Sequence, residues 1–265
     1  MSRRIVIGDI HGCYHTLIKL LDKIQIKPKE DELYFLGDLV GKGRFSDRVL
    51  DYISTYPQSS LVLGNHDISW LRHCFHVPQE NREDFVALAN HPNATAWQNF
   101  LLKQPFLIDL PEGVLVHAAI DYQWGIAEAT RVAKQLSQDL RDNPQSFFAN
   151  IQVPKVLKWD KALTKAEERY LALQIFTRAR YYHQDGRFEL ECTEPPESKP
   201  ELIPWYQQPR KIKKPIWFGH WASLSARQLA FDVNLDGGAV YGGKLIAMDL
   251  ISKERWEQKK VVEDE

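Results

Sequence analysis

The sequence has few cysteines, almost no net charge and no long apolar run. Its three cysteines among 265 residues are widely spaced and form no metal-type pair, which predicts a reducing compartment, the cytoplasm. A formal net charge of −1 and a pI near 6.8 give no general attraction to nucleic acid or to an anionic membrane. No window approaches ~20 uninterrupted apolar residues, so neither a membrane-spanning helix nor a signal peptide is expected.

The composition is that of a globular protein, since 44% hydrophobic residues suffice for a core. The length predicts a single domain over residues 1–265, with room for an insert. Apolar, strand-like runs alternate with amphipathic helices at the beginning of the chain. The strands are expected at 4–7, 33–36 and 60–63, and the helices at 14–24 and 46–56. This β-α-β-α-β order predicts a parallel sheet with covering helices.

The rest of the chain changes in pattern. Helical segments within about 68–104 and 124–180 supply no obvious sheet, and we interpret them as a cap inserted beside the sheets. Residues 193–215 are rich in proline and charge, which predicts a surface loop. Further strands are expected at 106–109, 113–117, 216–218, 228–233, 244–250 and 254–261, and a hairpin at 180–190. A late antiparallel set of this kind predicts a mixed or two-sheet α/β architecture.

Polar side chains follow five of the apolar strands, at the point where each strand ends. They are Asp9 and His11, Asp38, Asn65 and His66, His117, and His220. In α/β sheets, ligands usually bind in the crevice beyond the carboxyl ends of the strands. One such residue alone is more often a helix cap or a hydrogen-bonded structural residue. Five strand ends of this kind together predict a shared site.

The residue types point to bound metal. Carboxylates, imidazoles and one amide, with no thiolate, suit Mn, Fe, Zn or Mg better than a structural zinc. Asp38 has two oxygens and can bridge two ions, and two-metal sites hold ions ~3.5–4 Å apart and activate water. His66 follows Asn65 directly and cannot easily share its direction. It is therefore a candidate general acid toward a leaving group, or a charge partner for phosphate.

Five short motifs resemble those of the calcineurin-like metallophosphoesterases of the phosphoprotein-phosphatase type. They are GDIHG at 8–12, GDLVGKG at 37–43, GNHD at 64–67, VHA at 116–118 and FGHW at 218–221. FTRAR at 176–180 and the extension of the last motif to FGHWASL are not general phosphoesterase features. These two motifs resemble the bacterial symmetrical diadenosine tetraphosphatases, and the likeness runs through nearly the whole chain.

The resemblance implies a fold of two packed mixed β-sheets flanked by helices, with a helical cap insert. It implies two divalent metal ions, with Mn²⁺ as the first choice and Mg²⁺, Co²⁺, Fe or Zn²⁺ as others. The ligands implied are Asp9, His11 and Asp38 for one ion and Asp38, Asn65, His117 and His220 for the other. His66 would protonate the leaving phosphate oxygen.

The implied activity is hydrolysis of diadenosine 5′,5‴-P1,P4-tetraphosphate at its centre, giving two ADP. Related dinucleoside polyphosphates and nucleoside-tetraphosphate-capped RNA are further expected substrates, with no membrane and no obligate protein partner. A phosphoprotein phosphatase acting on phospho-Ser/Thr or phospho-Tyr would use the same metal site and is the main alternative. A non-enzymatic metal-dependent scaffold would have lost one or more ligands, whereas all six are present.

The sequence departs from the wider family at two positions. The family pattern GDxVDRG has an Asp that orients the catalytic histidine, and this chain has Gly41 at that position. The tetraphosphatases also lack this Asp, so its absence favours them over the protein phosphatases. Lys42 replaces the Arg that follows, so it can pair with phosphate only as a point charge, and Arg44 is a candidate substitute. Arg178 is expected to contact phosphate, while Arg180 could equally contact phosphate or serve as a helix C-terminal cation.

Overall fold

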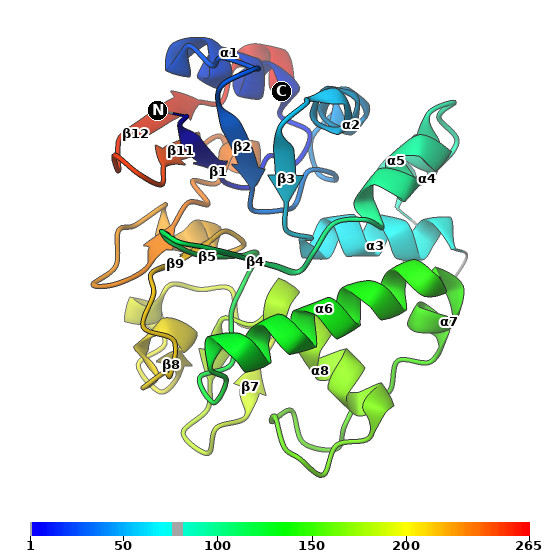
Figure 1. Ribbon diagram of the computed structural model, residues 1–265, viewed down its shortest axis with the longest axis vertical. Helices are drawn as coiled ribbons and strands as arrows, with labels where there is room; N and C mark the ends of the chain where they lie inside the picture. Colours follow the sequence, from blue (N-terminus) through cyan, green and yellow to red (C-terminus); the bar gives the residue numbers. More distant parts are fainter. Residues whose placement is uncertain (1, 76–81) are drawn as a thin grey trace.

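Two mixed β-sheets form the centre of the protein (Figure 1), and the computed structural model describes residues 2–75 and 82–265. The first sheet has the strand order β12-β11-β1-β2-β3, and the second has the order β10-β9-β5-β4. The strands of the first sheet are β1 (Arg4–Ile7), β2 (Glu32–Phe35), β3 (Ser59–Leu61), β11 (Lys244–Asp249) and β12 (Arg255–Lys259). The strands of the second sheet are β4 (Leu107–Leu110), β5 (Gly113–Val116), β9 (Ile216–Phe218) and β10 (Val233–Asn234).

The first sheet is buried on both faces, as its apolar strands require. β1, β2 and β3 run parallel, as predicted, and β11 pairs antiparallel with β1 and with β12. Ile5 and Ile7 pack into the main apolar core, whereas Val6 between them belongs to a second apolar cluster. That cluster also contains Leu115 and Trp217 of the second sheet, so it lies between the two sheets and confirms that they pack together.

Two amphipathic helices cover the outer face of the first sheet (Figure 1). They are α1 (Tyr14–Ile24) and α2 (Ser46–Thr55), close to their predicted bounds. Their buried residues follow the expected helical spacing: Leu17, Leu20, Leu21 and Ile24 on α1, and Val49, Leu50 and Ile53 on α2. These helices connect β1 to β2 and β2 to β3, which keeps the three strands parallel and brings their carboxyl ends to one edge.

The remaining helices lie beside and beyond the second sheet (Figure 1). They are α3 (Asn65–Cys74), α4 (Glu83–Ala89), α5 (Ala94–Leu101), α6 (Ile126–Asp142), α7 (Pro144–Ala149) and α8 (Lys165–Thr177). α6 contacts β4, and α3 contacts α7, which ties the later helices to the sheet layer. Part of the predicted helical stretch at 68–104, residues 76–81, lies outside the described residues. The division of the chain into one domain with a cap stays a prediction.

A third, small sheet and several single turns complete the fold. β6 (Tyr181–Tyr182) pairs with β7 (Phe188–Glu189), which confirms the expected hairpin, and with β8 (Ile203–Pro204). The prediction of a plain loop at 193–215 is therefore wrong in part, since β8 lies within it. The 3₁₀ turns are Pro196–Ser198, Trp205–Gln207, Ala222–Leu224, Ala239–Tyr241 and Val262–Asp264.

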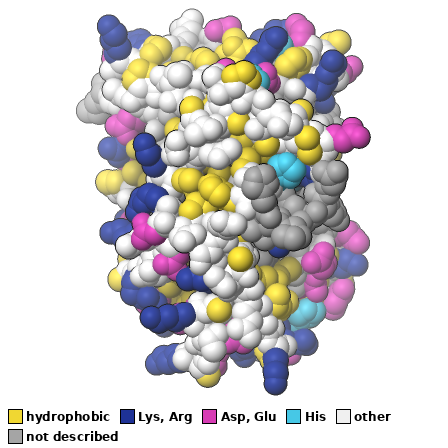
Figure 2. Space-filling model, turned by 90° about the vertical axis from the view of Figure 1, so that its right-hand side faces the viewer, with side chains coloured by type: hydrophobic (Ala, Val, Ile, Leu, Met, Phe, Trp, Pro, Cys, Tyr) yellow, Lys and Arg dark blue, Asp and Glu magenta, His cyan; other side chains and the backbone are white. Residues whose placement is uncertain are grey.

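The strand predicted at 228–233 is also shorter than expected. Only Val233 and Asn234 form β10, which pairs parallel with β9. Within residues 2–75 and 82–265, no helix combines the length and apolarity that crossing a membrane requires. On the face shown in Figure 2, basic side chains are scattered among acidic and apolar ones and form no continuous basic field.

Candidate active site

The carboxyl ends of five strands converge on one pocket of about 270 Å³. β1, β2 and β3 are parallel within the first sheet, and β5 and β9 are parallel within the second. The residues that follow these strands therefore meet where the two sheets pack. The predicted residues that line the pocket are Asp9, His11, Asp38, Lys42, Asn65, His66, Arg180 and His220. His117 is fully buried behind them, with its Nε2 3.2 Å from the Asn65 Oδ1.

The loops that carry these residues have unusual backbone conformations. His11, Asp38, Lys42 and His220 all have φ between 48° and 66°, the left-handed region that non-glycine residues seldom adopt. Such conformations persist only where surrounding contacts hold them, and they cluster at functional sites. Because four such residues lie at one pocket, tertiary contacts rather than local backbone preferences determine where the site residues lie.

Asp67 provides one of these contacts. Its buried carboxylate accepts backbone hydrogen bonds from Asp38 (2.9 Å), Leu39 (3.0 Å) and Gly64 (3.0 Å). It thereby joins the loop after β2 to the loop after β3. Burial, followed by repulsion from Asp38, raises the pKa of Asp67 to about 7.

Three of the predicted histidine ligands have one ring nitrogen fixed by a backbone carbonyl. His11 Nδ1 donates to Val40 O (3.2 Å), His117 Nδ1 to Leu36 O (2.5 Å), and His220 Nε2 to Arg178 O (2.9 Å). Because a carbonyl oxygen only accepts, each contact fixes the tautomer and leaves the other nitrogen with a free lone pair. Burial lowers the pKa of all three imidazoles, for His117 to about 4, so they are neutral, as metal ligation requires.

Two of these three free nitrogens face carboxylate oxygens. His11 Nε2 lies 3.3 Å from Asp38 Oδ2, and His117 Nε2 lies 3.6 Å from Asp38 Oδ1. Each pair sets one lone pair against another, an arrangement that a cation between the atoms would stabilise. Burial raises the pKa of Asp38 to about 6, and burial followed by repulsion from Asp236 raises that of Asp9. The residues present therefore fit divalent cations.

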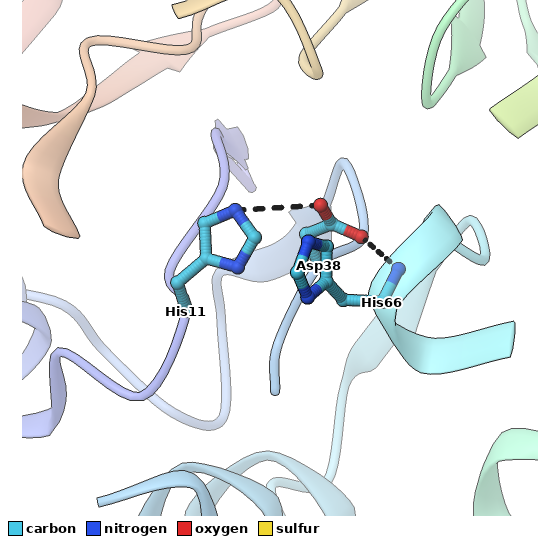
Figure 3. A group of neighbouring side chains, drawn as sticks. All are labelled: His11, Asp38 and His66. Carbon is cyan, nitrogen blue, oxygen red and sulfur yellow. Dashed lines mark hydrogen bonds and ion pairs between the residues drawn. The ribbon is translucent and has the colours of Figure 1, made fainter. Parts of the chain in front are cut away.

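Two clusters of candidate ligand atoms overlap at Asp38. One contains His11, Asp38 and His66, and the other contains Asp38, His117 and His220. Figure 3 shows the first cluster, in which the His66 backbone N–H donates to Asp38 Oδ1 (2.8 Å) and His11 faces the other carboxylate oxygen. The Asp9 carboxylate accepts from the backbone N–H of His220, at 3.1 and 3.0 Å. An overlap at Asp38 is the arrangement that a bridging carboxylate requires.

The affinity of the protein for Mn²⁺ is expected to rise about fivefold between pH 5 and pH 6, and to level off above pH 7. Metal binding needs the ionised form of Asp38, whose folded pKa lies near 6, so each proton released strengthens binding as pH rises through that value. His117 is already neutral at pH 5 and adds no pH dependence there. Calorimetric titration of Mn²⁺ at several pH values measures this, and a flat affinity from pH 5 to pH 7 would contradict it.

His66 has a contact that the sequence does not reveal. Arg82 Nη1 lies 3.2 Å from His66 Nδ1, and its guanidinium also pairs with Asp84. Because arginine only donates, Nδ1 accepts and the proton of the neutral ring is on Nε2. A Cβ on Gly41 would lie 2.7 Å from His66 Nδ1 and 2.9 Å from Arg82 Nη2, so Arg82 occupies the space beside Gly41. Burial, followed by repulsion from His11, lowers the pKa of His66.

The four basic residues that were candidates for phosphate contact lie in different parts of the structure. Lys42 reaches into the pocket, where its Nζ bonds the Tyr241 hydroxyl. Arg180 also lines it and donates to His220 O (2.9 Å), while its Nε has no partner among the described residues. Arg178 is exposed and holds His220 through its carbonyl, and its side chain lines a neighbouring cavity. Arg44 bonds the Glu265 carbonyl instead, so the expectation that it substitutes at the site is wrong.

Asp236 is a site residue that sequence reasoning missed. It is buried, lines the pocket, and accepts a hydrogen bond from the Gly238 N–H (3.0 Å). It follows β10 just as His220 follows β9, and β10 is parallel to β9. The signal was an Asp soon after a strand, and it was overlooked because the strand was expected at 228–233, whereas β10 ends at Asn234.

The model of the calcineurin-like phosphoesterase family matches residues 2–223, and the chain belongs to this family. Members of a metallophosphoesterase family require divalent metal ions, in agreement with the His and Asp clusters at the strand ends. The fold class and the metal-dependent class expected from the motifs are thus confirmed.

Several proteins of similar sequence carry the more specific name symmetrical bis(5′-nucleosyl)-tetraphosphatase. Those of Vibrio cholerae and Proteus mirabilis are 32% and 33% identical to this chain; each alignment covers 96% of it, and 95% and 94% of those proteins. A solved structure described as "a putative diadenosine tetraphosphatase" has a TM-score of 0.70 at 21% identity and covers 98% of this chain and 95% of its own. A cold-active protein-tyrosine phosphatase from Shewanella has a TM-score of 0.52 at 14% identity, covering 98% and 81%. The likeness to these two structures shows that this chain shares their fold.

Proposed function

We propose that this protein hydrolyses diadenosine tetraphosphate and related dinucleoside polyphosphates at the central anhydride, giving two nucleoside diphosphates. The observation that carries the proposal is the overlap of two clusters of candidate metal ligands at Asp38, with His66 in one of them. The relatives named symmetrical bis(5′-nucleosyl)-tetraphosphatase, which align over almost their full length, support the choice of substrate.

The residues proposed to hold the metal are those implied by the sequence: Asp9, His11, Asp38, Asn65, His117 and His220. When bound, two divalent ions there would acidify a water molecule and place positive charge beside the phosphates. Mn²⁺ is the proposed metal, because nitrogen and oxygen donors without sulfur suit it. Asp236 would add a further carboxylate to the same pocket.

The reaction proposed is attack of water on one inner phosphorus atom with cleavage of the central P–O bond. His66 would give a proton to the oxygen that leaves with the second nucleoside diphosphate, while the proton of the water passes to solvent. The negative charge of the bound tetraphosphate would oppose the effects of burial and of neighbouring cations that lower the pKa of His66. Arg180 and Lys42 would contact the phosphates, the first through its planar guanidinium and the second as a point charge.

Two observations favour a small-molecule polyphosphate over a phosphoprotein. Arg82 fills the space beside Gly41, where protein phosphatases carry the orienting Asp. The pocket is also lined by Arg180, whose guanidinium suits a ligand that carries several phosphates. Nucleoside-tetraphosphate-capped RNA shares the reacting phosphates and stays a proposed second substrate.

Incubation of the purified protein with Mn²⁺ and either diadenosine tetraphosphate or a phosphopeptide tests the proposal. We expect ADP as the only nucleotide product, with no ATP or AMP, and little phosphate released from the peptide. Release of phosphate from the peptide without formation of ADP would overturn the proposal. Formation of equal amounts of ATP and AMP would show that the cleavage is not symmetrical.

Lys42→Ala is expected to raise the KM for diadenosine tetraphosphate about tenfold, whereas Lys42→Arg should keep or raise the activity. The reason is that Lys42 supplies positive charge within the pocket, which an Arg retains with a bidentate fork. Steady-state kinetics of both variants provide the measurement. A large loss of activity in Lys42→Arg would mean that the contact with the Tyr241 hydroxyl, rather than the charge, is what the site needs.

A further inference from the structure

A second cavity of about 510 Å³ opens beside His66. It lies among α3, α4, α7 and α8, between the sheet layer and the later helices. Asn65 and His66 line both this cavity and the metal pocket, so the two spaces adjoin. Its volume is within the range of about 300–1,000 Å³ that small-molecule sites occupy.

The charges along this cavity are mainly positive. Arg72, Arg82 and Arg178 line it, and Glu191 is the one acidic residue among its described lining. Arg82 is paired with Asp84, but Arg72 and Arg178 have no ion-pair partner within residues 2–75 and 82–265. The Nε of Arg72 is buried without a hydrogen-bond partner in the same described part of the chain. Guanidinium groups that line a cavity without an ion-pair partner favour an anionic ligand.

Another part of the cavity lining is apolar and aromatic. It is formed by Phe148 of α7, by Tyr170 and Leu173 of α8, and by Ile151 and Leu190. Phe148 and Leu173 are buried, and the Tyr170 ring is half-buried. A ring of this kind can stack on a planar base, a contact that contributes to nucleotide binding without hydrogen-bond readout. Cations next to an aromatic wall thus match a phosphate joined to a nucleoside.

Two of the arginines lie at different distances from the metal pocket. Arg82 contacts His66 directly, at the end nearest the metal pocket. Arg72 lies six residues after His66 on the same helix, about 9 Å further along its axis at 1.5 Å per residue. A phosphate chain that begins at His66 would therefore reach Arg82 first, and its nucleoside would extend toward Arg72 and Tyr170.

We propose that this cavity binds one nucleoside diphosphate half of the substrate, with its phosphates at Arg82 and Arg178 and its base against Tyr170. The inference rests on the proposed function and adds the place of one nucleoside. It means that the later helices, α7 and α8, select a nucleotide over a bare polyphosphate. Arg72 acts as a binding residue only and takes no part in bond cleavage.

Inhibition by ADP and by inorganic pyrophosphate, which lacks the nucleoside, separates the base contact from the phosphate contact. We expect Tyr170→Leu, which keeps an apolar side chain but removes the ring, to raise the Ki of ADP about tenfold and to leave that of pyrophosphate within twofold. Arg72→Gln should raise the Ki of ADP, with kcat unchanged. Arg141→Gln is the matched control, because it removes the same charge from an exposed site on α6.

Equal changes in both inhibition constants for Tyr170→Leu, or no change in either constant for Tyr170→Leu and Arg72→Gln, would overturn the assignment of the cavity. Thermal melting of each variant identifies one that has failed to fold, and the other variant then decides. If the wild-type protein cleaves diadenosine tetraphosphate and neither substitution changes the Ki of ADP, only this inference fails. If the wild-type protein does not cleave diadenosine tetraphosphate, the proposed function itself fails.

Discussion

Asp38→Ala is expected to leave a folded protein that retains less than one metal ion per chain and hydrolyses diadenosine tetraphosphate about 10³-fold more slowly, a loss of ~4 kcal/mol at the transition state. Asp38 is the one residue common to both clusters of candidate ligands, so its removal affects both proposed ion positions. Metal content by mass spectrometry of the dialysed protein, together with kcat at saturating Mn²⁺, provides the measurement.

The fold itself should survive this change. The buried Asp38 carboxylate has a pKa raised to about 6, so at pH 7 its ionised form destabilises the metal-free protein and its removal relieves that cost. We therefore expect the metal-free variant to melt at or above the temperature of the metal-free wild type. Asp22→Ala, on the exposed face of α1, is the control for loss of a carboxylate. Two ions per chain in Asp38→Ala would contradict the role of Asp38.

His66→Ala is expected to lower kcat for diadenosine tetraphosphate by about 10²–10⁴-fold while metal content and KM change little. The proposed role of His66 is to protonate the leaving oxygen, which affects bond cleavage more than binding. With p-nitrophenyl phosphate the loss should be much smaller, because nitrophenolate leaves without a proton. Kinetics with both substrates and metal analysis of the same samples provide the measurement.

Other results for His66→Ala would point to other roles. A rise in KM with kcat unchanged would make His66 a charge partner for phosphate, the alternative that the sequence left open. Loss of metal would make it a ligand, which its place in a cluster with His11 and Asp38 allows. His183→Ala, at a histidine that pairs with Glu189 outside the site, is the matched control.

Much of the fold follows from local patterns in the sequence. Residues 5–7 and 33–36 are apolar at every position, which predicts strands that are buried on both faces. α1 and α2 follow from apolar residues at helical spacing, and their buried stripes are those expected. The misjudged segments were short: β8 and β10 have two residues each, too few for any periodicity to appear.

The candidate ligands could be chosen from the sequence because each follows a strand that is itself readable. A parallel arrangement brings strand ends together, so Asp9, Asp38 and Asn65 needed only their position after β1, β2 and β3. Asp236 was missed because the predicted strand at 228–233 had the wrong bounds, although the pairing of β10 with β9 places it in the same pocket. Which residue binds which ion stays a prediction.

The sequence by itself determined the class of protein, since an Asp, Asn or His directly after a strand is a local feature that can be recognised without knowing how the side chains pack. Only the tertiary structure decided how those groups are held. The tautomers of His11, His117 and His220 depend on carbonyls of Val40, Leu36 and Arg178, which lie far from them in the sequence. Arg82 reaches His66 because α3 and α4 pack together and Gly41 leaves room for its guanidinium. The physical reason is that the direction of a side chain depends on contacts between distant segments, which a local pattern does not contain.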